Sequence, residues 1–219
     1  MHDDERITTA AFHAAEGVGD WRVVATGPQA VFLADSFAHA ASLVAAVAEA
    51  AERHGVRPDV DLRPEAAVVS VPHPDFEGIP AGAAPFAAAV SSAGAALGLR
   101  AEPALVQSIQ LYVAQHSEAD VRAFFLAALG YEPFGDADAV DPLRRGPQLA
   151  VNPITGDAAG RGRTHLDVFV PADRWRARVE AAAEAGGRIA DEAQAPAWVT
   201  LASPDNHGVD IAGWPDARD

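Results

Sequence analysis

The fold is decided by the stretch Thr164-His165-Leu166-Asp167-Val168-Phe169-Val170, because a pattern of strands and a helix begins there for the second time in the chain. The first run goes from a strand at 106–114, through a helix capped by Ser117 and ended by Gly130, to strand-like pieces up to 148–151. From residue 164 a strand, a helix capped by Asp173 and strands at 198–202 and 208–212 follow in the same order. Two copies of β-α-β-β-β within about 110 residues are an internal repeat. Since each copy alone would leave its sheet face bare, we expect the two copies to pair.

The first half of the chain predicts a different arrangement. Its predicted elements follow the order α-β-β-α-β-α. They are a helix from Thr8 or Thr9 to Glu16, strands at 21–24 and 30–33, a helix at 37–51, a strand at 66–71 and a helix at 86–97. This order predicts one antiparallel sheet with helices on one face. The last helical stripe ends at Leu97-Gly98, and a charged residue and a proline follow, so we place a boundary near residue 102. The expected fold class is therefore α+β, with domains at 1–102 and 103–219.

Composition excludes several classes of function. The 219 residues carry 16 basic and 31 acidic side chains, and the net charge of −15 opposes binding to nucleic-acid phosphates or anionic membranes. No apolar run approaches the ~20 residues of a membrane span, and the acidic start Met1–Glu5 lacks the basic residues of a signal peptide. Without cysteine there is no disulfide and no thiolate site. We expect a cytoplasmic protein whose partner is a small molecule.

Three stretches of the second half carry a family resemblance: Ala127–Glu132, Arg161–Val168 and Ser203–Asp210. With them, residues 106–214 resemble the vicinal oxygen chelate superfamily (glyoxalase I, bleomycin-resistance proteins, extradiol dioxygenases), and most closely the glyoxalase-like domains common in high-GC actinobacteria. The resemblance implies a sheet curled around a cleft, which commonly offers a divalent metal one ligand from each of four strands. Carried over by position, the four ligand sites fall on Ser108, Asn152, His165 and Asp210.

Only His165 and Asp210 of these four are good ligands for Zn²⁺, Ni²⁺, Mn²⁺ or Fe²⁺. A catalytic metal site usually has three protein ligands and one open position, so we expect no tightly bound metal and no cofactor. His165 is the candidate catalytic residue, and the alternative is a strand histidine that is hydrogen-bonded inside the cleft. For Asp210 the alternative is a solvated carboxylate near a sheet edge. Apolar and aromatic walls with a few polar groups are usual in ligand pockets, which predicts the ligand-binding residues Tyr112, Arg163, Phe169 and Trp198.

The first half carries a second resemblance, in the run Ala51–Pro64 with its Pro-Asp-Val-Asp-Leu-Arg core, in Asp20-Trp21 and in Gly78-Ile79-Pro80. Residues 6–99 resemble pterin-4a-carbinolamine dehydratase, also called 4a-hydroxytetrahydrobiopterin dehydratase, in which histidines supply the acid–base function. The family's adjacent histidine pair falls on Val56 and Arg57, and its third histidine falls beside His73. Valine cannot carry a proton and arginine stays protonated, so we expect this activity to be lost.

Three functions remain open. The first is a binding or catalytic protein of the glyoxalase/bleomycin-resistance type, with its ligand in the C-terminal cleft and the N-terminal domain used for assembly. The second is a lyase of the dehydratase type, in which His73 is the acid–base residue and Arg57 contacts the ligand. The third is a non-enzymatic oligomeric scaffold, because the resembled dehydratases self-associate and alanine-rich helices offer an apolar face. A homo-oligomer, a dimer in the simplest case, is expected.

Overall fold

The computed structural model describes residues 5–72, 78–115, 122, 126, 130–136, 138–153, 164–202 and 208–213. They form two compact units, and the boundary along the chain lies between Val106 and Gln107. The sequence placed this boundary near residue 102, and the short 3₁₀ helix η1 (Pro103–Leu105) lies between the two positions. Among the described residues, no helix has the length and apolar character needed to cross a bilayer.

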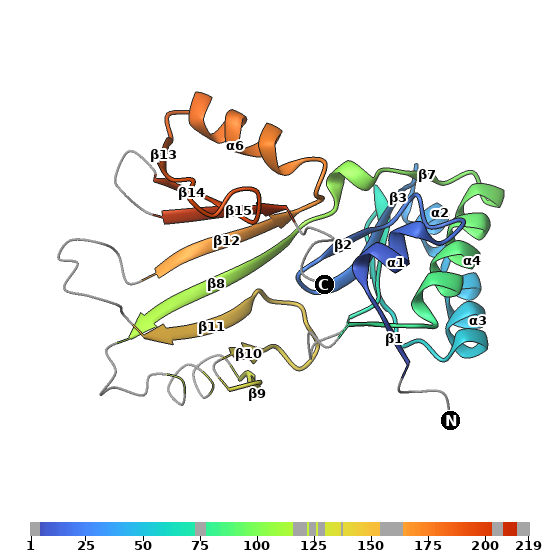
Figure 1. Cartoon of the computed structure of the whole chain (residues 1–219). Helices are drawn as coiled ribbons and strands as arrows, with labels where there is room; N and C mark the ends of the chain where they lie inside the picture. Colours follow the sequence, from blue (N-terminus) through green and yellow to red (C-terminus); the bar gives the residue numbers. More distant parts are fainter. Residues whose placement is uncertain are drawn as a thin grey trace. The chain divides into compact units, whose positions relative to one another are not determined.

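The first unit is an antiparallel sheet with helices. The strands β2, β3, β5 and β4 form the sheet in that order, β7 pairs with β3, and β1 pairs with β6 in a separate two-stranded ladder. Figure 1 shows α2, α3 and α4 together on one side of the larger sheet. The elements are β1 (Arg6–Ile7), α1 (Thr9–Ala14), β2 (Arg22–Val24), β3 (Gly27–Leu33), α2 (Phe37–Ala41), α3 (Val44–His54), β4 (Asp59–Leu62), β5 (Ala66–Ser70), β6 (Ile79–Pro80), α4 (Ala83–Ala96) and β7 (Arg100–Ala101).

The short strands β1, β6 and β7 were not predicted, and two larger features also differ from the sequence-based prediction. The helix expected at 37–51 is divided into α2 and α3, since the Ser42 hydroxyl donates a 2.6 Å hydrogen bond to the His39 carbonyl oxygen and ends α2. The strand β4 was not predicted. It alternates carboxylates with apolar residues, and aspartate is depleted in strands, so its pairing with β5 decides the structure there.

The core of the first unit forms around Trp21, which is fully buried. Its indole Nε1 donates to the Ala87 carbonyl oxygen (3.1 Å) and lies 3.2 Å from the Ser91 hydroxyl. Its ring meets that of Phe86 edge-on, with 5.9 Å between centroids. Through these contacts Trp21, which lies just before β2, packs the sheet against α4.

The second unit is one eight-stranded sheet with the order β13-β14-β15-β12-β8-β11-β10-β9. The two modules repeat each other in space: β8 is followed by β11, β10 and β9 on one side, and β12 by β15, β14 and β13 on the other. They join where β8 and β12 pair antiparallel, and most of the helix predicted between residues 117 and 130 lies outside the described residues. The elements are β8 (Ser108–Gln115), β9 (Glu132–Phe134), β10 (Asp138–Val140), β11 (Gln148–Pro153), β12 (Thr164–Val170), α6 (Trp175–Glu184), β13 (Arg188–Asp191), β14 (Val199–Ala202) and β15 (Gly208–Gly213).

One face of this sheet is apolar. Val179 of α6 packs against strand residues of the second module, and Figure 1 shows α6 lying along β13–β15. Because side chains alternate between the two faces of a strand, the intervening residues point to the opposite face. That opposite face carries the polar residues of the sheet. The buried members of the two apolar clusters are Val170, Val179, Val199, Leu201 and Ile211 in one, and Val113, Ala139, Leu149 and Val151 in the other.

Candidate functional site

The strand register brings several predicted site residues to the polar face. His165 of β12 is level with Tyr112 of β8 and Gly208 of β15. Two residues further along β12, Asp167 is level with Asp210 of β15. Residues that pair across strands share a face of the sheet, so an imidazole, a phenol and two carboxylates lie close together at the junction of the two modules.

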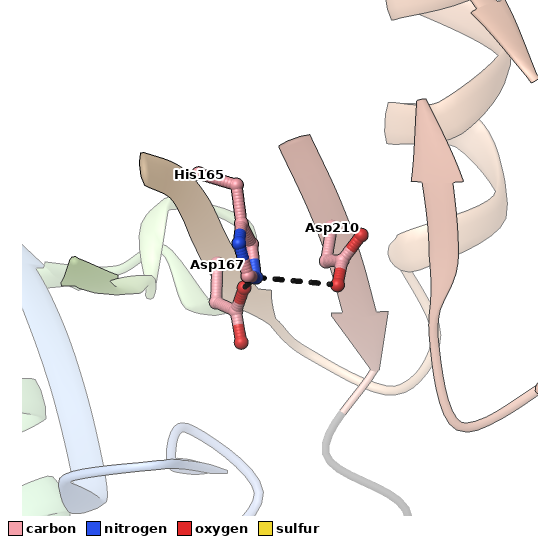
Figure 2. Close-up of side chains that lie close together, drawn as sticks. All are labelled: His165, Asp167 and Asp210. Atoms are coloured by element: carbon pink, nitrogen blue, oxygen red, sulfur yellow. Dashed lines mark ion pairs between the residues drawn. The ribbon is translucent and has the colours of Figure 1, made fainter. Parts of the chain in front are cut away.

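The geometry of this cluster centres on Nε2 of His165 (Figure 2). This nitrogen lies 3.1 Å from Oδ1 of Asp167 and 3.7 Å from Oδ2 of Asp210. The three donor atoms are all within 4.8 Å of one another. The side chains of Asp167 and Asp210 are 14% and 19% exposed, and that of His165 is 38% exposed. Although 3.1 Å is a hydrogen-bond distance, Oδ1 of Asp167 is buried and no described group offers it a hydrogen bond of good geometry.

Neighbours on both adjacent strands position His165. The Tyr112 ring stacks on the imidazole, with 4.8 Å between centroids and 17° between planes. On the other side, a Cβ atom added at Gly208 would lie 3.2 Å from the Cβ of His165. This is tighter than ordinary van der Waals contact, so glycine at 208 leaves the space that His165 occupies.

The charges of the cluster favour a bound cation. The pKa of His165 is raised, chiefly by its interaction with the Asp167 carboxylate, against the opposing effect of burial. The pKa of Asp167 is also raised, first by burial and further by the nearby charge of Asp210, while His165 opposes the shift. Two carboxylates facing one nitrogen therefore attract either a proton on that nitrogen or another positive ion.

Two of the four predicted ligand positions lie outside this cluster. Ser108 shares the polar face and pairs with Phe169, and its Oγ is buried with no hydrogen-bond partner among the described residues. Asn152 pairs with Ala114, about 7 Å along the strand from the level of His165 and two strands away from it. The register places Gln148, instead of Asn152, level with Asp167 and Asp210, and this corrects the position carried over from the sequence.

The remaining predicted residues are dispersed or not described. Phe169 is 9% exposed on the polar face of β12, and Trp198 is half-buried just before β14. In the first unit Arg57 is exposed. His73 and Arg163 lie outside the described residues. The structure therefore brings together Tyr112, His165 and Asp210 from the predicted set.

Sequence reasoning missed Asp167, although a signal for it was present. Residues two apart on a strand share a face, so a strand that carries His165 toward the cleft also carries Asp167 there. The alternative of an edge carboxylate for Asp210 does not hold, because β15 lies between β12 and β14 in the sheet.

The comparisons with known proteins concern the second unit. Residues 110–212 match the family model described as "Glyoxalase-like domain". A solved structure of a glyoxalase/bleomycin resistance protein/dioxygenase superfamily member from Vibrio splendidus 12B01 matches at 13% identity. The match covers 49% of this chain and 99% of that chain with a TM-score of 0.34, and we base no argument on it. No curated protein matches the chain. The resemblance predicted for the second half is thus confirmed at the level of the domain: residues 110–212 carry a glyoxalase-like domain.

Proposed function

We propose that the C-terminal unit binds a small molecule on the polar face of its sheet, beside a divalent cation held by His165, Asp167 and Asp210. The observation that carries the proposal is the convergence of one imidazole nitrogen and two carboxylate oxygens within 4.8 Å. The glyoxalase-like domain supports a small molecule as the ligand, and the acidic character of the chain supports a cation as the bound ion.

The spacing of the donor atoms fits a shared ion. Ligand atoms bound at ~2.0–2.2 Å to one metal ion stand roughly 3.0–3.5 Å apart. The separations of 3.1 and 3.7 Å from Nε2 are close to this range. Oδ1 of Asp167 is buried without a well-formed hydrogen bond, which leaves its lone pairs available. Mixed nitrogen and oxygen donors suit Mn²⁺, Fe²⁺, Ni²⁺ or Zn²⁺.

Asp167 is the reason that this proposal differs from the expectation of no metal. That expectation counted two good ligands, whereas a catalytic site usually has three with one position open. The three residues come from two neighbouring strands of a sheet, so their backbone positions are fixed by the pairing of β12 with β15. His165 must lose its proton from Nε2 to ligate, and the cation therefore competes with a proton.

A bound divalent ion would act as a Lewis acid that polarises an oxygen of the small molecule. The chain's own residues would orient that molecule. Tyr112 fixes the imidazole plane by stacking, and Phe169 contributes an apolar surface on the same face. Trp198 and Arg163 remain predicted ligand-binding residues.

Isothermal titration with Mn²⁺, Ni²⁺ and Zn²⁺ tests the proposal. We expect one ion per chain in the wild type, and loss of this binding in His165→Ala and in Asp167→Asn. Asp191→Asn is the matched control: Asp191 is an exposed carboxylate on β13 that accepts a hydrogen bond from the Ala193 backbone, which asparagine can also accept. The proposal would be overturned if the wild type bound none of the three ions, or if His165→Ala and Asp167→Asn bound the ion as the wild type does.

For the N-terminal unit, the dehydratase and assembly functions stay predictions. At the first two family histidine positions Val56 is buried and Arg57 is exposed, and neither side chain can give up and regain a proton at neutral pH. An interface between copies would bury the exposed Phe37 and Val44, which are 54% and 37% exposed on α2 and α3. Light scattering on the full chain, with and without Phe37→Ser and Val44→Ser, tests the assembly role.

A further inference from the structure

The polar face extends beyond the His165 cluster onto the first module, where neutral residues replace charged ones. Gln110 of β8 is level with Gln148 of β11, as Asp167 is level with Asp210 in the second module. Gln110 and Asp167 are themselves cross-strand partners at the junction of the modules. Ser108 precedes Gln110 by two residues, as His165 precedes Asp167. The first module therefore places a serine and two glutamines where the second places a histidine and two aspartates.

The polar atoms of this surface are buried, and one of them has no hydrogen-bond partner among the described residues. Gln110 is 6% exposed on β8. Ser108 Oγ, on the same face of β8, is buried and has no partner in the described part of the chain. A buried polar group without a partner destabilises a fold. This hydroxyl, beside the buried amide of Gln110, points to a ligand that supplies the missing partner.

Gln148 adds an oriented acceptor to this surface. Its Nε2 donates a 3.1 Å hydrogen bond to Oδ2 of Asp138, whose pKa is raised mainly by burial. With its amide nitrogen engaged there, Gln148 leaves Oε1 to accept from a ligand. Gln110 and Ser108 can each both donate and accept.

The charge pattern disfavours an anionic ligand group. The residues level with Gln110 on the three neighbouring strands are Gln148, Asp167 and Asp210, and none carries a positive charge. An anionic group over β8 would be repelled by the carboxylate of Asp167, whereas the negative charge of Asp138 is countered by the nearby guanidinium of Arg122. The surface instead suits a group with an N–H donor and a C=O acceptor on adjacent atoms.

We propose that Ser108, Gln110 and Gln148 form a hydrogen-bonding subsite for an uncharged carboxamide or lactam group of the small molecule. The inference rests on the proposed function, since it names the chemical class of ligand taken by the same sheet face. The amide of Gln110 pairs with the N–H and C=O of that group, and the free oxygen of Gln148 accepts the second N–H where the group is a primary carboxamide.

Nuclear magnetic resonance with benzamide as the probe tests the subsite. We expect benzamide to shift the side-chain NH₂ signals of Gln110 and Gln148 in the ¹⁵N-labelled full chain. N,N-dimethylbenzamide lacks the N–H donor and benzoate is charged. Each should bind at least about fivefold more weakly than benzamide, which is the effect of losing one hydrogen bond. Gln110→Leu should weaken benzamide by the same factor, whereas Gln194→Leu, at an exposed glutamine in the turn before β14, should not.

The outcomes separate the subsite from the metal site. If benzamide binds Gln110→Leu as tightly as the wild type, or if it leaves the glutamine signals unchanged, then only water occupies this position. Either result would show that the proposed subsite is wrong. Mn²⁺ titration of Gln110→Leu should match the wild type, which also shows that this variant is folded. Benzamide binding without any metal binding would leave the subsite standing and remove the metal from the proposed function.

Discussion

Nε2 of His165 and Oδ1 of Asp167 lie 3.1 Å apart, and the two residues are neighbours on the same face of one strand. The backbone of β12 fixes the spacing of this pair, because side chains two residues apart on a strand share a face. Asp210 joins it from β15 and completes a site with two carboxylates and one imidazole.

Replacing Asp167 with asparagine should lower the pKa of His165. The Asp167 carboxylate is the largest cause of the raised pKa, while burial of the ring acts in the opposite direction. Titration of the His165 imidazole signals, with a chelator present, measures this. Asp191→Asn should leave the titration unchanged, and a His165 pKa that does not move in Asp167→Asn would show that the pair has no electrostatic coupling.

Protonation of His165 should stabilise the fold on the acidic side of neutrality. Its folded-state pKa is raised above the ordinary value of a histidine, so its contribution to stability is full below the unfolded pKa and is lost as the pH rises through the folded pKa. In metal-free protein, the difference in unfolding free energy between the wild type and His165→Gln should be largest near pH ~5 and small above pH ~8. Urea denaturation across this range measures it, and a difference that does not vary with pH would contradict the assignment.

Gly208→Ala should weaken both metal binding and the fold. The new Cβ would lie 3.2 Å from the Cβ of His165 and push the imidazole from its position. We expect a loss of roughly tenfold in metal affinity, the scale seen when a ligand's support is altered, and a loss of ~1–3 kcal/mol in stability from overpacking. Gly19→Ala is the control, because nothing lies within 4 Å of a Cβ added there. Titration calorimetry and urea denaturation give the two quantities.

Asp141→Asn should destabilise the second unit at neutral pH and have less effect in acid. The Asp141 carboxylate accepts from the backbone nitrogens of Leu143 and Arg145 and from the Arg145 side chain, and these bonds lower its pKa to about 2. A lowered pKa means stability that is present above the unfolded pKa and is lost as the pH falls through the folded pKa. The stability gap between the wild type and Asp141→Asn should therefore narrow below pH ~4. Asp136→Asn, in the exposed turn after β9, is the control variant.

The paired modules were predictable because each repeats the same order of strand and helix within the chain. The positions of Asn152 and Gln148 were not. Which residue of β11 is level with His165 depends on its parallel pairing with β8, almost forty residues earlier in the sequence, and a local pattern holds no record of that register. Asp167 could have been predicted, because residues two apart on a strand share a face. A ligand set transferred from family positions does not include it.

The two larger errors of the sequence-based prediction in the first unit have similar causes. The break between α2 and α3 is made by one serine hydroxyl that bonds to a backbone carbonyl, within a run whose apolar spacing continues through it. The strand β4 is held by its partner β5, against the low strand preference of its aspartates. In both cases a specific contact outweighs the average tendency of the residues.

The antiparallel junction of β8 and β12 also offers a route to protein engineering. Because Ser108 and Gln110 occupy on one strand the places that His165 and Asp167 occupy on the other, Ser108→His together with Gln110→Asp and Gln148→Asp would duplicate the acidic triad. Such a triple variant would carry two matched centres related by the internal symmetry of the domain, and counting bound ions per chain would show whether the duplication succeeded.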